Sequence, residues 1–254
     1  MRRVFITGAS SGIGEALARH YAGADTTIGL FARRGDLLER LAAGLPGRTA
    51  VYPADITDLD AIAGATKDFI ARVGAPDLVI ANAGVSVGTH GDELQDVPKL
   101  LRVLEVNVAG LAATLAAFAP AMRSAGSGTL CGIASVAGFR GLPGAGAYSA
   151  SKAAAIAWLE ALRAELSGSG IAVVTICPGY IDTPMTQVNR YRMPFLLSAD
   201  EAARRFARAI EAKRRLAVIP WQMALMSALL QAMPGWLYDR LAARAPRKPR
   251  DVRI

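Results

Sequence analysis

The sequence predicts an α/β fold in which a doubly wound, seven-stranded parallel sheet carries helices on both faces. Short apolar runs alternate with longer segments of helical spacing along the 254 residues. Several short runs are apolar throughout, which is typical of parallel strands covered on both faces by helices. Hydrophobic residues make up 52% of the chain and aromatic residues 6%, which suits close packing of helices on a sheet. In such a fold the ligand lies beyond the carboxyl ends of the strands.

These patterns place seven strands and five of the helices between them. The expected strands are Val4–Thr7, Thr27–Ala32, Thr49–Pro53, Leu78–Ala81, Thr129–Ile133, Val173–Cys177 and Leu216–Ile219. The expected helices are Gly12–Tyr21, Asp36–Ala43, Leu59–Val73, Pro98–Ser124 and Tyr148–Leu166. Because no repeat or linker interrupts residues 1–215, we expect a single domain over residues 1–254.

The formal net charge of +8 is concentrated at the C-terminal end. Residues 240–254 hold one acid, Asp251, and the basic residues Arg240, Arg244, Arg247, Lys248, Arg250 and Arg253. A solvated terminus is the first interpretation of this tail, and contact with an anionic surface is the alternative. We do not expect nucleic-acid binding, because the basic residues are not interleaved with stacking aromatic residues.

The two cysteines, Cys131 and Cys177, both lie in runs that we expect to be buried strands. This position gives no support to a disulfide framework or to a metal site. Residues 1–8 already form a strand and a glycine turn, which leaves no room for a secretory signal. We therefore expect a cytoplasmic protein, with membrane association as an alternative that the C-terminal segment raises.

A glycine turn follows the first strand and opens the first helix. Its sequence is Thr7-Gly8-Ala9-Ser10-Ser11-Gly12-Ile13-Gly14. Gly8 permits the tight turn, Gly12 lets a pyrophosphate approach the backbone, and Gly14 permits close packing of the helix on the strand. The helix N-terminus adds N–H groups and a partial positive charge. We interpret the turn as a phosphate site; a glycine-rich turn without a ligand is the alternative.

The spacing of these glycines resembles the Thr-Gly-x-x-x-Gly-x-Gly turn of short-chain dehydrogenases/reductases, and further motifs follow in that family's order. They are Asp55 with Ile56, Asn82-Ala83-Gly84, Asn107, Ser135, Tyr148 with Lys152, and Pro178-Gly179 with Ile181 and Thr183. Ala81 departs from the pattern, since many members carry a further Asn there. The resemblance implies a Rossmann-type oxidoreductase that transfers a hydride between a nicotinamide dinucleotide and a ketone, an aldehyde or a secondary alcohol.

The resemblance also implies which residues bind the dinucleotide. They are Gly8, Ser10, Ser11, Gly12, Ile13, Gly14, Asp55, Ile56, Asn82, Ala83, Gly84, Tyr148, Lys152, Pro178, Gly179, Ile181 and Thr183. The second strand ends at Ala32 and is followed by Arg33 and Arg34, with no acid to bind the 2′-hydroxyl of NAD(H). We expect Arg33 to bind the 2′-phosphate, which favours NADP(H) over NAD(H), and we interpret Arg34 as a bystander. A solvated basic pair is the alternative.

Tyr148 and Lys152 are four residues apart and share one face of a helix. Reduction of a ketone leaves an alkoxide that needs a proton, and a phenol can supply it when a nearby ammonium favours the phenolate. By resemblance, Tyr148 is the general acid or base, Lys152 also holds the nicotinamide ribose, and Ser135 orients the carbonyl. By resemblance again, Asn107 anchors a water that passes protons from Lys152; a local structural role is its alternative.

The resemblance divides the chain by task. Residues 1–184 form the cofactor-binding and catalytic core, residues 185–215 hold the substrate lid and the following helix, and residues 216–254 hold the last strand, an apolar segment and the basic tail. The lid, Met185–Ser198, is rich in apolar residues. Those expected around the substrate are Met185, Met193, Phe195, Leu196, Leu197, Val136, Phe139, Leu142 and Tyr180. They favour a lipophilic substrate, although a mobile lid needs apolar residues in any case. A homodimer or homotetramer is expected.

From Leu216 to Tyr238 no residue carries a charge. Pro220, Pro234 and Gly235 break this segment, and the helical part, Trp221–Met233, is about 20 Å long, too short to span a bilayer. Three interpretations remain for residues 221–238: they cover the subunit core, form a dimer contact, or lie in a membrane interface with Lys213, Arg214, Arg215 and the basic tail near anionic headgroups.

Two other classes of function are weighed against an enzyme. A dinucleotide-binding sensor keeps the glycine turn but is expected to lack the Tyr148 and Lys152 pair, which this chain has. A membrane-recruited scaffold is favoured only if the C-terminal segment binds lipid and the protein consumes no cofactor. The complete set of motifs therefore favours an oxidoreductase.

Overall fold

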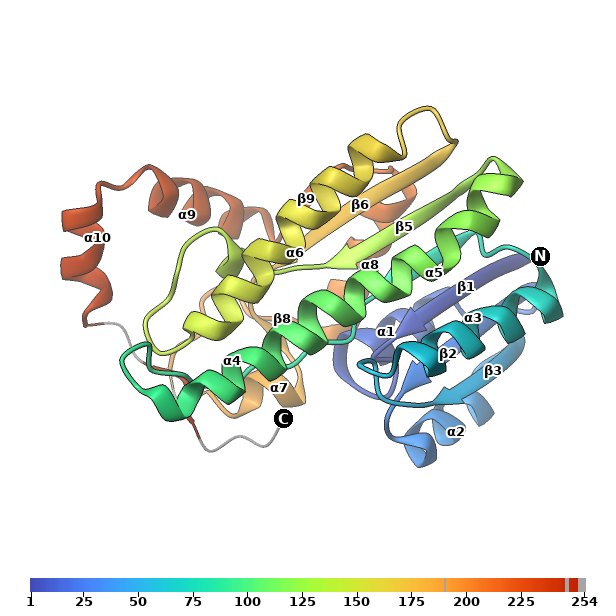
Figure 1. The fold of residues 1–254 in the computed structure, drawn as a ribbon, viewed down its shortest axis with the longest axis horizontal. Coiled ribbons are helices and arrows are strands. Elements are labelled where there is room, and N and C mark those ends of the chain that lie inside the picture. The colour runs from blue at the N-terminus through green and yellow to red at the C-terminus, as the bar shows by residue number, and fades with distance from the viewer. Residues whose placement is uncertain (190, 245–246, 251–254) are drawn as a thin grey trace.

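A parallel sheet lies at the centre of the computed structural model, which describes residues 1–189, 191–244 and 247–250 (Figure 1). Its seven strands have the order β3-β2-β1-β4-β5-β6-β9. Their bounds are β1 Arg2–Thr7, β2 Thr26–Ala32, β3 Arg48–Pro53, β4 Leu78–Ala81, β5 Gly128–Ile133, β6 Ile171–Pro178 and β9 Leu216–Ile219. The direction of chain winding reverses between β1 and β4, so a ligand crevice is expected at their carboxyl ends. The predicted fold class is confirmed.

Helices cover both faces of this sheet. Their bounds are α1 Gly12–Tyr21, α2 Gly35–Ala43, α3 Leu59–Val73, α4 Val97–Leu104, α5 Gly110–Ala125, α6 Gly146–Glu165, α7 Pro184–Gln187, α8 Ala199–Glu211, α9 Trp221–Ala232 and α10 Gly235–Ala242. Helices α1, α2 and α8 bury Leu17, Leu38 and Phe206 in the core on one face. Helices α3 and α5 bury Phe69 and Phe118 on the other face, beside α6. Each of these side chains contributes roughly 1.5–3 kcal/mol by burial.

The long fourth helix differs from the continuous helix expected over residues 98–124. A π-helical turn, Glu105–Ala109, separates α4 from α5 and carries Asn107. The helical run Leu94–Ala125 is long and apolar enough to cross a membrane by length and composition alone. Because Leu115 and Phe118 of this run are buried against the sheet, it occupies the position of a core helix. A further pair of short strands, β7 Ile181–Asp182 and β8 Leu197–Ser198, connects the segment after β6 to the start of α8.

The C-terminal helices project from the body of the molecule (Figure 1). Helix α9 buries only Met223 and Ser227, and none of the residues of α10 is buried. Covering the subunit core is therefore not the role of most of this segment. The basic residues 213–215 precede β9, whereas α9 follows it, and their expected place near anionic headgroups together with the apolar segment stays a prediction.

The last described residues return to the body. The backbone N–H of Gly88 donates to the carbonyl oxygen of Pro249 at 2.9 Å, and Arg250 forms an ion pair with Asp96 at 2.9 Å. The Lys248 ammonium donates to the carbonyl oxygen of Met185 at 3.5 Å. The expectation of a solvated terminus is therefore wrong for residues 248–250, while Asp251 and Arg253 lie outside the described residues.

Candidate active site

A cavity of about 410 Å³ lies at the carboxyl ends of the strands, where the winding reverses. Its wall includes every residue expected to bind the dinucleotide except Gly14, and three of the four expected catalytic residues, Ser135, Tyr148 and Lys152. Asn107 lies behind this wall. A cavity of this size fits a small-molecule ligand.

The glycine turn forms one end of the cavity. Gly8 has a φ of +67°, a conformation that favours glycine. A Cβ atom on Gly14 would lie 2.2 Å from the carbonyl oxygen of Gly8, so only glycine lets α1 start this close to β1. The Asn82 amide donates to the carbonyl oxygens of Thr7 and Gly8 at 3.1 and 3.3 Å, which ties the turn to the end of β4.

The N-terminus of α1 faces this turn and fits the phosphates of a dinucleotide. Its N-cap residue, Ser11, makes no capping hydrogen bond with its side chain. The Ser11 hydroxyl instead accepts a hydrogen bond from Arg34 at 2.6 Å. The first N–H groups of the helix therefore receive no side-chain cap, and such groups bind phosphate well.

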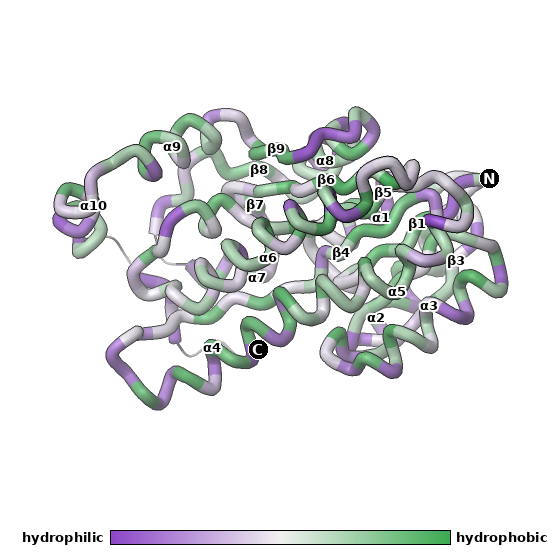
Figure 2. Tube along the Cα trace, turned by 45° about the horizontal axis from the view of Figure 1, so that its top comes forward, coloured by the Kyte–Doolittle hydropathy of each residue, from purple (hydrophilic) through white to green (hydrophobic). Residues whose placement is uncertain are grey.

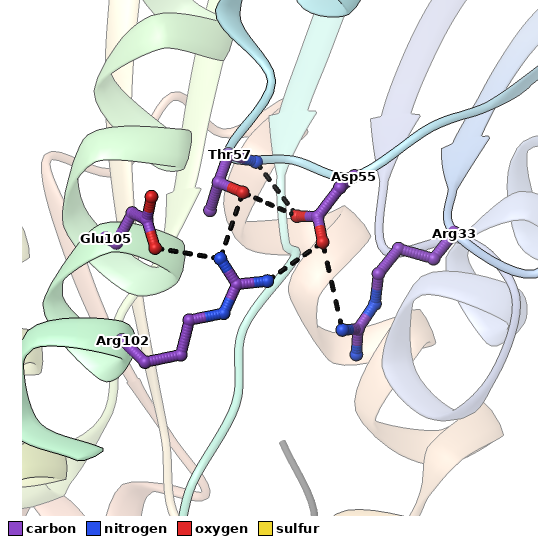
Figure 3. Close-up of polar contacts among 5 residues, drawn as sticks. All are labelled: Arg33, Asp55, Thr57, Arg102 and Glu105. Carbon is purple, nitrogen blue, oxygen red and sulfur yellow. Dashed lines mark hydrogen bonds and ion pairs between the residues drawn. The ribbon is translucent and has the colours of Figure 1, made fainter. Parts of the chain in front are cut away.

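Asp55 connects the cavity to α4 through a cluster of charged side chains (Figure 3). Its carboxylate accepts hydrogen bonds from the Thr57 backbone N–H at 3.0 Å, the Thr57 hydroxyl at 2.9 Å and Arg102 at 2.8 Å. Arg102 also pairs with Glu105 at 2.8 Å, and Arg33 lies 3.9 Å from the same Asp55 oxygen that Arg102 binds. Burial acts to raise the pKa of Asp55, but the bonds from Thr57 and Arg102 outweigh it and lower that pKa.

Arg34 lies in the cavity wall, although the sequence interpretation made it a bystander. Its guanidinium donates to the Ser10 hydroxyl at 2.9 Å as well as to Ser11. Two consecutive arginines therefore lie along the cavity wall, Arg33 toward Asp55 and Arg34 toward the glycine turn. The sequence does not show which arginine points to which group, because this depends on the direction of each side chain where α2 begins.

Ser135, Tyr148 and Lys152 meet at the opposite end of the cavity. Ser135 follows β5, and its hydroxyl accepts a hydrogen bond from the Ala137 N–H at 3.1 Å. Tyr148 and Lys152 lie on α6, with the ammonium 5.7 Å from the centre of the phenol ring. Lys152 donates to the carbonyl oxygen of Ile133 at 2.8 Å, which leaves its other two N–H groups for a ligand.

Burial dominates the acid–base properties of this group. It lowers the pKa of the Lys152 ammonium to about 8. It also raises the pKa of the Tyr148 phenol, and a hydrogen bond with the Ser135 side chain opposes part of this increase. The Lys152 ammonium lies 5.7 Å from the centre of the phenol ring, and its expected effect on the phenolate stays a prediction. The phenol is thus held in its protonated form at neutral pH.

Comparisons with known proteins agree with this geometry. The sequence profile of the family described as short chain dehydrogenase matches residues 2–193. The chain belongs to the short-chain dehydrogenase family. An uncharacterized oxidoreductase of Myxococcus xanthus is 36% identical over 96% of this chain and 97% of its own length. Dehydrogenase/reductase SDR family member 7B of Bos taurus is 33% identical over 97% of this chain and 82% of its own.

A solved structure extends the likeness to three dimensions. An alcohol dehydrogenase from the archaeon Thermococcus sibiricus, complexed with 5-hydroxy-NADP, has a TM-score of 0.75 and 27% identity. The match covers 86% of this chain and 96% of the archaeal one. This short-chain dehydrogenase is therefore an oxidoreductase of a family that uses nicotinamide dinucleotides.

In this short-chain dehydrogenase, Asn107 is held by its neighbours and does not reach the cavity wall. Its Oδ1 accepts from the Val85 N–H at 2.8 Å, and its Nδ2 donates to the Val85 carbonyl and the Ser151 hydroxyl, both at 2.9 Å. A Cβ atom on Gly84 would lie 3.2 Å from this Oδ1 and 3.5 Å from the Lys152 ammonium. Gly84 thus lies close to both the amide and the ammonium, and the proton relay expected of Asn107 stays a prediction.

The lid of this short-chain dehydrogenase is only partly in place around the cavity. Met185 lines the wall, whereas Phe195 and Leu196 are 47% and 43% exposed. Val136, Phe139, Leu142 and Tyr180 are not among the residues that line this cavity, and their expected place around the substrate at its mouth stays a prediction. Within the described residues, no group of three His, Cys, Asp or Glu side chains is placed to hold a metal ion.

Proposed function

We propose that this short-chain dehydrogenase is an NADPH-dependent reductase of lipophilic ketones or aldehydes. The observation that supports it most is that Ser135, Tyr148 and Lys152 line the same cavity as the glycine turn, with the Lys152 ammonium 5.7 Å from the centre of the Tyr148 ring. Bound NADPH supplies the hydride. Two hydroxyls directed at one oxygen can bind a carbonyl group and polarise it.

Each side chain has one task in this proposal. Ser135 donates a hydrogen bond to the carbonyl oxygen and holds it within reach of Tyr148. The Tyr148 phenol gives its proton to that oxygen as negative charge develops there. Lys152 stabilises the phenolate that remains, and its free N–H groups bind ribose hydroxyls. The raised pKa of Tyr148 supports the reductive direction, because the group must start protonated.

The preference for NADPH rests on the two arginines. Arg33 and Arg34 lie in the cavity wall at the end of β2, where an acid selective for NAD(H) is absent. Their planar guanidinium groups match the oxygens of a 2′-phosphate. The archaeal relative complexed with 5-hydroxy-NADP is consistent with this assignment.

The substrate class rests on the apolar lid. Met185 lines the cavity, and the exposed side chains of Phe195 and Leu196 belong to the same lid. Closure of the lid over an apolar molecule would remove the apolar surface of these side chains from water. The physiological assembly in this proposal is a homodimer or homotetramer in the cytoplasm, with a small carbonyl or alcohol compound as the ligand.

The test follows absorbance of NADPH, then NADH, against medium-chain and cyclic ketones and aldehydes. The Tyr148→Phe variant should bind NADPH normally while kcat falls about 100- to 10,000-fold, the usual contribution of a general acid. Tight NADPH binding without turnover by the natural protein would favour the dinucleotide-binding sensor instead. Normal turnover by Tyr148→Phe would remove Tyr148 from the mechanism.

A further inference from the structure

We propose that α9 and α10 form a surface that binds anionic membranes. This C-terminal apolar surface consists of Trp221, Leu225, Met226, Leu229, Trp236 and Leu241. The inference concerns where the protein binds and does not depend on the proposed reaction. Figure 2 shows that α9 is hydrophobic along most of its length while standing at the edge of the molecule.

The apolar surface is a continuous face of α9. Trp221, Leu225 and Leu229 follow each other at four-residue spacing and are 67%, 68% and 67% exposed. Met223 and Ser227, on the opposite face, are buried. The helix thus places its apolar side chains outward on one face while the other packs on the body, an arrangement that leaves large apolar area in water.

The dimensions favour a helix that lies in the membrane interface. Helix α9 has 12 residues and is about 18 Å long, much shorter than a bilayer core of about 30 Å. Trp221 begins α9, and Trp236 lies near the start of α10, 70% exposed. Exposed tryptophans are well suited to the headgroup region, because the ring is apolar and its N–H group finds polar partners there.

The surrounding charge favours lipid over a second copy of the chain. Arg240 is exposed in α10 next to the acid Asp239, and Arg244 is exposed two residues after that helix ends. A twofold contact would gather this surface of both subunits into one interface, where the four arginines of the two copies would repel one another. An anionic headgroup layer attracts each of them by about 1 kcal/mol.

The apolar surface is firmly joined to the region of the active site. Arg140, in the segment after β5, donates to the carbonyl oxygens of Leu230 and Met233 at 2.5 and 2.9 Å, at the end of α9. On the inner face, the Met223 side chain would contact a Cβ atom on Gly179, which lines the cavity. Binding of α9 to a bilayer would therefore place the cavity close to lipophilic molecules in it.

The experiment measures co-sedimentation of the full chain with vesicles of phosphatidylcholine, alone or mixed with phosphatidylserine. We expect binding to the mixed vesicles, more than about 100-fold weaker for W221S/L225S/L229S. The variant R240Q/R244Q should bind about 30-fold more weakly, because two attractive charges are lost. The matched control L94S/L101S changes exposed leucines on another part of the molecule and should bind normally.

Tryptophan fluorescence gives a second reading on the unaltered protein. Two of the three tryptophans belong to the apolar surface, and the third, Trp158, lies partly buried in α6. Vesicles should therefore shift the emission to shorter wavelength. Failure to bind mixed vesicles, with NADPH binding intact, would overturn the proposal. A dimer in light scattering that W221S/L225S/L229S abolishes, without lipid binding, would assign the surface to a second copy.

Discussion

Asp55 holds two guanidinium groups with unequal strength. Arg102 reaches one of its oxygens at 2.8 Å, whereas Arg33 lies 3.9 Å from that oxygen and its side chain is 53% exposed. Arg102 and Thr57 therefore satisfy much of the carboxylate without Arg33. An exposed pair at such a distance contributes little, so Arg33 can turn toward a phosphate at small cost.

Replacement of Arg33 tests this division. We expect Arg33→Ala to weaken NADPH binding by about tenfold to hundredfold, the usual range for a charge-assisted contact, with a much smaller effect on NADH. The measurement is Kd for both dinucleotides by fluorescence titration. Arg34→Ala is the matched control: a larger selective loss there would move the 2′-phosphate site to Arg34, and equal losses for both dinucleotides would contradict a role in selectivity.

The lowered pKa of Lys152 predicts a pH dependence. This ammonium is protonated below about pH 8 and loses its charge above it, so kcat should be constant at neutral pH and fall as pH rises through about 8. The pKa of Lys248 is also lowered to about 8, by burial beside the lid. If Lys152 is the titrating group, the kcat of Lys248→Met should still fall as the pH rises through about 8. If kcat no longer falls in that variant, the titration belongs to Lys248.

Among the elements, α1 can pack against the glycine turn only because its residue 14 has no side chain. Gly14→Ala should abolish NADPH binding and lower the midpoint of thermal unfolding, because its Cβ atom would lie 2.2 Å from the Gly8 carbonyl oxygen. Gly64→Ala is the matched control in α3, where no atom lies within 4 Å of an added Cβ. It should raise stability by about 0.5–1 kcal/mol. A Gly14→Ala protein that binds NADPH normally would contradict the role given to this approach.

The sequence alone predicted the elements that a local pattern of apolar residues marks. All seven sheet strands lie within two residues of their expected bounds, because each is a short apolar run between turns. The π turn at Asn107 was not predictable in this way. Its partners, Val85 and Ser151, are distant in sequence, and only the packed structure brings their polar groups to one amide. The same reason applies to Arg102, whose contact with Asp55 joins α4 to the end of β3.

For the whole molecule, the sheet separates the candidate active site, at its carboxyl edge, from the basic residues 213–215. Its carboxyl edge gathers the glycine turn, the side chains proposed to be catalytic and the start of α9, whereas residues 213–215 lie at the amino end of β9. The formal charge of +8 therefore does not describe one basic surface. The family motifs predicted which side chains meet at the cavity, but the outward direction of α9 and the return of the tail depend on contacts that composition does not encode.

The return of residues 248–250 makes the end of the chain a reporter of what occupies the mouth of the cavity. A Cβ atom on Gly144 would touch the Arg247 side chain, and Pro249 is hydrogen bonded to Gly88. Trypsin cleaves after arginine but not between lysine and proline, so it can cut at the Arg250–Asp251 bond at the end of this docked segment and at the Arg247–Lys248 bond before it. Only the Arg247–Lys248 cut removes the whole segment. A bulky substrate that displaces the segment should hasten this cut, and the coenzyme alone should not. The mass of the shortened chain would thus distinguish the two ligands without any turnover.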